Sequence, residues 1–257
     1  MDVLNFDYLK GAFNPVHFMN KAYGIAADAW QVEVLKAQAK RKILLCGRQT
    51  GKSTVCASMA LHTALYTDNA LVLIVSAVFR QAQETFNKVK GGLAFAKGMC
   101  SITYETQTML KLTNGSRIVC LPGKQDKVRS FSAVTLLIID EAAHVEDALY
   151  KAMRPMLSVS GGELVALSTP FGKRGWFHDA WFGSSRWFRI KTTAYDCPRI
   201  DEEFLNEERE EIGDWWFKQE YLCEFVDDAS KVFSHDLFLA SLTSEGKALV
   251  VGERWAA

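Results

Sequence analysis

The sequence predicts an α/β fold in which a mostly parallel sheet is covered by helices on both faces. Short, unbroken apolar runs alternate along the chain with longer segments whose apolar residues recur at helical spacing. A run that is apolar on both faces is typical of a covered parallel strand, and strands joined through helices imply right-handed crossovers. The 257 residues, 49% of them hydrophobic, suffice for one sizeable core but scarcely for two full domains.

The N-terminal part is predicted to run from an irregular lead-in through helix, strand, helix and strand. Residues 1–25 show no clear period and predict an irregular or partly helical segment. A helix is expected from Asp28, which can cap it, to the basic residues 40–42, which suit its negative C-terminal end. The apolar runs 43–46 and 71–75 predict buried strands, and the segment between them has a helical pattern.

The rest of the chain continues the alternation after an insertion. A helical pattern covers residues 79–95, and short alternating segments then surround Asn114-Gly115, a strong hairpin signal that predicts an antiparallel hairpin or edge strands. Further strands are expected at 135–139, 163–168 and 187–192, and a helix at 147–157. The glutamate-rich residues 201–213 predict a helix with a solvated face, and the aromatic residues 215–225 a packing helix.

Charge and cysteine content exclude several classes of protein. The 30 basic and 30 acidic residues balance, so nothing in the composition indicates a protein that coats nucleic acid over its whole surface. The apolar runs are far shorter than the roughly 20 residues that cross a bilayer, and we expect no membrane partner. The six cysteines form no CxxC pair, which favours buried reduced thiols over disulfides or zinc and fits a cytoplasmic setting.

The segment from Cys46 to Thr54 lies between a predicted strand and a predicted helix, the context of a phosphate-binding loop. Gly51 lets the backbone approach a phosphate, Lys52 supplies a positive charge, and the Ser53 hydroxyl can bind Mg²⁺. The residues expected around the phosphates are Arg48, Gln49, Thr50, Gly51, Lys52, Ser53 and Thr54. Cys46 stands where the usual GxxxxGK[ST] pattern has its first glycine.

Two adjacent carboxylates, Asp140 and Glu141, end the apolar run 136–139. The ends of such strands line the ligand crevice of a parallel sheet. Asp140 is then placed to hold Mg²⁺, and Glu141, whose side chain points the other way, is placed to polarise an attacking water. An acid pair at a strand end can also begin a solvated loop, but the phosphate-binding loop upstream favours the catalytic interpretation.

Three motifs together resemble the ATPase domain of the large terminase subunit of tailed bacteriophages, the motor that pumps DNA into empty capsids. They are Arg48-Gln49-Thr50-Gly51-Lys52-Ser53, Asp140-Glu141-Ala142-Ala143 and Leu167-Ser168-Thr169-Pro170, within a match over residues 27–233. The resemblance implies a RecA-like P-loop NTPase of the ASCE class with a small C-terminal lid-like subdomain. It divides the chain into a lead-in at 1–27, an ATPase core at 28–195, a lid or linker subdomain at 196–233, and the start of a hinge at 234–257.

The resemblance also implies roles for single residues. Gln31 is similar to the family's adenine-reading glutamine, and Arg48 to the loop arginine that contacts phosphates within the same subunit. Arg129 matches the position of an arginine finger given to a neighbouring subunit, so the expected catalytic residues are Lys52, Glu141 and Arg129. Ser168-Thr169-Pro170 resembles the motif that couples the γ-phosphate state to DNA movement. The alternatives are an exposed helical glutamine without a role, pairing of Arg48 with a surface carboxylate, an ordinary surface arginine at position 129, and an ordinary turn that starts at Thr169-Pro170.

By the same resemblance the cofactors are ATP and Mg²⁺, and the partners are double-stranded DNA, the portal protein, the small terminase subunit and further copies of the chain in a ring, in the host cytoplasm. The family continues into a nuclease domain that is absent here, so we expect no DNA cleavage. Candidate phosphate contacts on DNA are Arg80, Lys88, Lys90, Lys124 and Lys127.

Other functions remain open from the residues alone. A helicase-like, DNA-dependent ATPase acting as a single chain shares these motifs, although the residues after Arg199 are too few and too acidic for a second RecA-like domain. A small-molecule kinase would not need Glu141, and a non-enzymatic nucleotide-binding module would not need it either.

Overall fold

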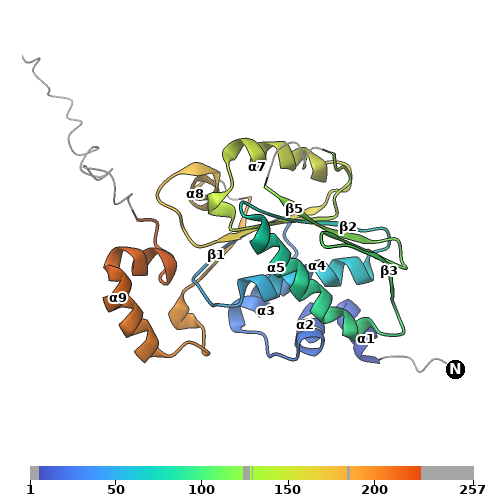
Figure 1. Ribbon diagram of the computed structural model, residues 1–257, viewed down its shortest axis with the longest axis horizontal. Coiled ribbons are helices and arrows are strands. Elements are labelled where there is room, and N and C mark those ends of the chain that lie inside the picture. The colour runs from blue at the N-terminus through green and yellow to red at the C-terminus, as the bar shows by residue number, and fades with distance from the viewer. Residues whose placement is uncertain (1–5, 124–127, 129, 184–185, 227–257) are drawn as a thin grey trace, which may run out of the picture. The chain divides into compact units, whose positions relative to one another are not determined.

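The computed structural model describes residues 6–123, 128, 130–183 and 186–226 (Figure 1). In this part of the chain eight strands form one sheet, in the order β3-β4-β5-β2-β6-β7-β1-β8. The strands are β1 (Arg41–Cys46), β2 (Leu71–Ser76), β3 (Ile102–Glu105), β4 (Met109–Leu112), β5 (Arg117–Pro122), β6 (Leu136–Asp140), β7 (Glu163–Ser168) and β8 (Phe188–Thr192). The sheet therefore matches the strands that the apolar runs predict.

The sheet is parallel except at one edge. β1 pairs in parallel with both β7 and β8, β2 with both β5 and β6, and β6 with β7. Strands β3 and β4 are antiparallel, and Lys111 of β4 faces Arg117 of β5 across the turn that contains Asn114-Gly115. Gly115 has φ +81°, a value that favours glycine. The predicted antiparallel insertion is confirmed, and it extends a parallel sheet instead of standing apart from it.

Helices connect the strands and cover both faces of the sheet. The α-helices are α1 (Phe6–Phe13), α2 (Pro15–Tyr23), α3 (Ala29–Lys36), α4 (Lys52–Tyr66), α5 (Phe79–Gly92), α7 (Asp147–Met153), α8 (Gly175–Phe182) and α9 (Glu202–Glu220). Short 3₁₀ turns are η1 (Leu93–Ala96), η2 (Ala142–His144), η3 (Arg154–Leu157) and η4 (Ala194–Asp196). Figure 1 shows α7 and α8 on one side of the sheet and α1 to α5 on the other.

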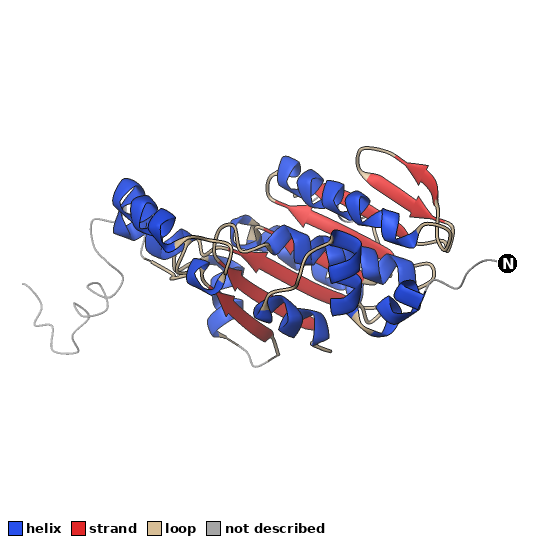
Figure 2. Ribbon diagram, turned by 90° about the horizontal axis from the view of Figure 1, so that it is seen from below, coloured by secondary structure: helices blue, strands red, loops and turns tan. Residues whose placement is uncertain are grey.

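Alternate residues of each strand enter different cores, as the two-residue period of a strand requires. Leu44 of β1 packs with α2, α3, α4 and α5, whereas its neighbours Ile43 and Leu45 pack with α7 and α8. Figure 2 views the molecule from the side of α2, α3, α4 and α5, so these helices lie in front of the strands. Because both faces of the sheet are covered, the carboxyl ends of the parallel strands remain the natural place for a ligand.

One expectation for the N-terminal part is confirmed and another needs correction. The lead-in is partly helical, because α1 and α2 cover most of its described residues, and Asn14 caps α2 because its side-chain oxygen accepts from the backbone N–H groups of Val16 and His17. Helix α3 ends at Lys36, so the basic residues 40–42 do not close it. Arg41 and Lys42 instead open β1, because pairing with β7 outweighs the local preference of basic residues for a helix end.

The cysteines and the helices bear on what the composition predicts about disulfides and membrane spans. All six cysteines are free, and five of them are buried. Among the described residues, no helix is both long enough and apolar enough to span a membrane. The predicted hinge segment 234–257 lies outside the described residues.

Candidate active site

Residues 47–51 form the loop that leads from β1 into α4. Two of its residues have left-handed backbone angles, Gln49 with φ +60° and Gly51 with φ +92°. The Thr50 hydroxyl donates to the Gly47 carbonyl at 2.9 Å, which holds the loop in a tight turn. Lys52 then begins α4. The unpaired N–H groups at the start of a helix, preceded by a turn of this kind, form a site for an anion such as phosphate.

The missing first glycine has a structural explanation. Cys46 is the last residue of β1, pairs with Thr192 of β8, and is not among the residues with positive φ, so its position does not require glycine. Burial raises the pKa of the Cys46 thiol. The close approach occurs one residue later, because a Cβ on Gly47 would lie 3.0 Å from the Tyr221 carbonyl oxygen and 3.1 Å from the Ala194 nitrogen.

Replacing Gly47 by Ala should therefore destabilise the fold. We expect the free energy of unfolding to fall by about 1–3 kcal/mol, because the new methyl group displaces two backbone atoms that are hydrogen-bonded to each other. Chemical denaturation measures this. The matched control is Gly91→Ala near the end of α5. A Cβ there meets nothing within 4 Å, and the change should stabilise the helix because alanine has a higher helix propensity than glycine. Equal stabilities for the two variants would contradict the prediction.

Asp140 ends β6 and has both carboxylate oxygens engaged. Oδ2 accepts a hydrogen bond from the Thr85 hydroxyl at 2.9 Å, and Oδ1 accepts from the Glu141 backbone N–H at 3.0 Å. The side chain is almost buried. Burial raises the pKa of Asp140, and the negative charge of Glu141 raises it further, while the Thr85 hydrogen bond and the charge of Lys52 oppose this rise.

Glu141 connects three segments of the site. Its Oε1 lies 3.4 Å from Lys52 Nζ, and its Oε2 accepts a hydrogen bond from the Ser168 hydroxyl at 3.2 Å. Its backbone is left-handed, with φ +50° and ψ +48°, which turns the chain sharply after β6. Residues from the start of α4, the end of β6 and the end of β7 thus meet at the carboxyl ends of parallel strands, as the sequence predicts for Lys52 and Glu141.

A cavity of about 720 Å³ opens beside these residues. Its wall includes Arg48, Gln49, Gly51, Lys52, Ser53, Thr54, Glu141 and Thr169, together with residues of α5 and α9. The volume is in the range of pockets that hold small molecules and cofactors. Of the loop residues that sequence analysis assigns, Thr50 alone is outside the wall, because its hydroxyl is turned inward to Gly47.

The donor atoms at this site suit Mg²⁺ bound with a phosphate. Ser53 and Asp140 offer hydroxyl and carboxylate oxygens, the ligands that Mg²⁺ prefers. Among the described residues there is no group of three or more histidine, cysteine or acidic side chains that could hold a metal ion. A protein cage for the metal is therefore absent from that part of the chain, and the arrangement fits a cation that keeps waters and takes ligands from phosphates.

Comparison with known proteins identifies the family. Residues 43–240 match the protein family described as "Terminase large subunit, T4likevirus-type, N-terminal". The chain belongs to this terminase family. It is 25% identical over 246 residues to the terminase large subunit of Escherichia phage T5, a match that covers 91% of this chain and 56% of that protein. The chain thus spans little more than half the length of this relative terminase.

Solved terminase structures share the fold. The large terminase ATPase domain of Thermus phage P74-26 has a TM-score of 0.74 at 21% identity, over 80% of this chain and 97% of that one. A large terminase from a thermophilic bacteriophage, solved in complex with ADP, has a TM-score of 0.67 at 15% identity, over 77% of this chain and 53% of that one. The α/β fold with a mostly parallel sheet is confirmed.

The structure places Gln31 behind the loop of this terminase domain. Gln31 lies at the start of α3, is 1% exposed, and its Oε1 accepts from the Asp28 backbone N–H at 3.0 Å. A Cβ on Gly51 would lie 2.7 Å from Gln31 Nε2, so the amide packs directly against the loop. The alternative of an exposed helical glutamine is wrong. Its predicted contact with adenine stays a prediction.

Arg48 is exposed, and it is tied to α9. Its Nε donates to Glu220 Oε2 at 2.7 Å, and its backbone N–H donates to the Glu220 carbonyl at 2.9 Å. Both residues line the cavity beside the loop. The ion pair with a carboxylate, one of the alternatives for Arg48, is present in this structure, and contact of Arg48 with a nucleotide phosphate remains a prediction.

The other predicted residues fall in three groups. Ser168, Thr169 and Pro170 are buried at the end of β7, where Ser168 contacts Glu141. Arg129, Lys124 and Lys127 lie outside the described residues. Of the candidate DNA contacts, Arg80 pairs with Glu84, Lys90 pairs with Glu105, and Lys88 lines the cavity beside the loop.

Some residues at the site escaped sequence analysis. Thr85 of α5 and Glu220 of α9 each bond a residue of the predicted site from a helix that carries no motif. Arg199 forms a two-point ion pair with Asp28, with distances of 2.6 and 2.7 Å, and its guanidinium would be 3.6 Å from a Cβ on Gly51. No local sequence signal marks these partners, because each is brought to the site by tertiary packing.

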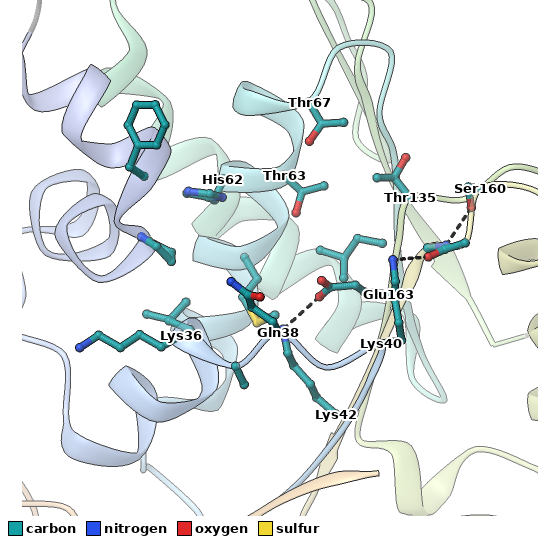
Figure 3. A pocket seen from close by; sticks show the side chains of 18 residues that line it. Lys36, Gln38, Lys40, Lys42, His62, Thr63, Thr67, Thr135, Ser160 and Glu163 are labelled. Atoms are coloured by element: carbon teal, nitrogen blue, oxygen red, sulfur yellow. Dashed lines mark hydrogen bonds and ion pairs between the residues drawn. The ribbon is translucent and has the colours of Figure 1, made fainter. Parts of the chain in front are cut away.

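A second cavity, of about 710 Å³, lies at the other end of the strands (Figure 3). Lys42 and Lys40 point into it, but Lys42 Nζ is 3.0 Å from Glu163 Oε2 and Lys40 Nζ donates to the Gly161 carbonyl at 2.5 Å. These cations therefore already have acceptors from the chain. The candidate active site is therefore the cavity beside the loop, where the Glu141 carboxylate, Lys52 and the start of α4 converge.

Proposed function

We propose that this chain is the ATP-hydrolysing domain of a motor that moves double-stranded viral DNA into procapsids. The observation that carries the proposal is the contact of Glu141 with both Lys52 and Ser168 beside the loop cavity. Nucleotide hydrolysis needs a cation for the phosphates and a carboxylate that orients water. Membership of the terminase family supports DNA packaging, and the relative solved with ADP supports an adenine nucleotide as ligand.

In the proposed reaction Lys52 leaves Glu141 and binds the phosphates that enter the loop. Ser53 and Asp140 would hold Mg²⁺, which would neutralise charge that develops on the phosphate oxygens. The freed Glu141 carboxylate orients a water and takes its proton as the water oxygen bonds the γ-phosphorus. The bond from this phosphorus to the bridging oxygen breaks, which yields ADP and phosphate.

Ser168 is proposed to link the reaction to movement. Its hydroxyl bonds the carboxylate that must turn toward water, so loss of the γ-phosphate changes the surroundings of β7 and of the buried Thr169-Pro170 segment. A small local shift of this kind can be amplified through packed elements. The proposed partners are the portal protein, the small terminase subunit and further copies of this chain in a ring. The proposed setting is the host cytoplasm. Residues 196–233 are the proposed lid.

A concentration series tests whether subunits complete each other's sites. At saturating Mg-ATP, we expect ATP hydrolysis per mole of protein to rise steeply with protein concentration, because a neighbour's arginine is needed for fast turnover. The measurement pairs a phosphate-release assay with light scattering on the same samples. Substantial activity that stays constant down to concentrations where the protein is a monomer would favour a helicase-like single-chain ATPase. No turnover at any concentration would refute the proposed ATPase.

A further inference from the structure

The carboxylate of Asp140 is held in one orientation by two donors. One is local, the backbone N–H of Glu141, the next residue along the chain. The other is distant in sequence, the hydroxyl of Thr85, 55 positions away in α5. A carboxylate offers about four acceptor sites, so two hydrogen bonds fix its plane and leave other lone pairs free.

Thr85 is unusual for a threonine inside a helix. Its side chain is fully buried, and its hydroxyl points to Asp140 Oδ2 at 2.9 Å. Helical threonines commonly bond a carbonyl of the preceding turn or face solvent. Because an ionised carboxylate only accepts hydrogen bonds, the hydroxyl of Thr85 is the donor here.

Helix α5 also contributes to the cavity wall on either side of Thr85. The cavity is lined by Gln81, one turn before Thr85, by the adjacent Glu84, and by Lys88, about one turn after Thr85. Thr85 itself is turned the other way, into the protein and toward β6. Thr85 does not line the cavity, and neither does Asp140, the almost buried candidate metal ligand that it contacts next to Glu141 of the cavity wall.

We propose that Thr85 is a positioning residue that fixes the Asp140 carboxylate for Mg²⁺. The inference rests on the proposed function, since it takes Asp140 as a ligand of the metal or of its water shell. Residues that hydrogen-bond a metal ligand hold it in the productive orientation, and their loss typically costs 10- to 100-fold in metal affinity. The position of α5 then determines the orientation of the Asp140 carboxylate, because Thr85 belongs to this helix.

The test compares Thr85→Val, which keeps the shape and removes the hydroxyl, with Thr85→Ser, which keeps the hydroxyl. ADP binding is measured by calorimetry in EDTA and over a series of Mg²⁺ concentrations, and Mn²⁺ binding at fixed ADP by electron paramagnetic resonance. Thr63→Val in α4, which lines the second cavity, is the matched control for losing a threonine hydroxyl from a helix. Thermal unfolding checks that each variant is folded.

We expect Thr85→Val to raise the half-saturating Mg²⁺ and Mn²⁺ concentrations about tenfold or more, with ADP affinity in EDTA unchanged. Thr85→Ser and Thr63→Val should resemble the wild type. Unchanged metal dependence in Thr85→Val would overturn the inference, as would an equal loss of ADP affinity with and without metal, since that indicates a structural role. A wild-type protein that binds no ADP would instead refute the proposed function, and this inference with it.

Discussion

Glu141→Gln is expected to lower the rate of ATP hydrolysis by about 10²- to 10⁴-fold, because the amide cannot accept the proton of the attacking water. Nucleotide binding should persist, since the phosphate-binding loop and Ser53 are unchanged. The structure adds a reason to expect that Glu141→Gln binds nucleotide at least as tightly as the wild type. Lys52 Nζ lies 3.4 Å from Glu141 Oε1, so removing this negative charge frees the lysine for phosphate. Single-turnover hydrolysis and ADP titration together measure the two effects.

The matched control is Glu84→Gln. Glu84 is a carboxylate in the wall of the same cavity, but it pairs with Arg80, whereas Glu141 contacts Lys52 and Ser168. Glu84→Gln changes the charge of the cavity by the same amount and should leave turnover within a fewfold of wild type. Near-normal turnover in Glu141→Gln would refute the assignment of Glu141. An equal loss in both variants would attribute the effect to net charge.

Arg129→Ala is expected to lower turnover about 10³- to 10⁵-fold, the range for loss of an arginine finger. Such an arginine stabilises the charge that builds on the phosphoryl oxygens in the transition state. Because Arg129 lies outside the described residues, the prediction rests on its position in the sequence. The rate should fall without a matching loss of nucleotide affinity, and Arg117→Ala, an exposed arginine at the start of β5, is the control.

Mixing the two inactive proteins decides whether the finger acts between subunits. An Arg129→Ala subunit retains Glu141, and a Glu141→Gln subunit retains Arg129. If the finger acts in trans, mixed assemblies contain interfaces with both groups intact, and phosphate release should rise well above that of either protein alone. No recovery, at concentrations where light scattering shows mixed assemblies, would contradict action in trans.

The fold was predictable because its strongest signals are local. The runs 43–46, 71–75 and 135–139 bury their apolar side chains only if helices cover both faces of the strand. Their assignment to parallel strands therefore needs no long-range information. Asn114-Gly115 likewise marks its own turn. The end of α3 was not predictable in the same way, since whether residues 40–42 continue a helix or open a strand depends on β7, which lies far along the chain.

The site was predictable to the extent that its residues sit at strand ends or in the loop. Lys52, Glu141 and Ser168 meet because each lies just after or at the carboxyl end of a predicted strand, and the carboxyl ends of parallel strands share one edge of the sheet. No sequence motif surrounds Thr85 or Glu220. A threonine and a glutamate inside helices are ordinary residues until packing shows which side chain faces Asp140 and which faces Arg48.

The left-handed backbone at Glu141 sets a conflict between stability and activity at that position. A non-glycine residue with φ +50° carries strain of about 1 kcal/mol or more, which glycine would relieve. Selection for thermal tolerance alone would therefore favour glycine there and discard the carboxylate that the proposed reaction needs. Selection for turnover keeps the glutamate, so directed evolution that selects for heat resistance and turnover together should leave this residue unchanged and gain stability at other positions.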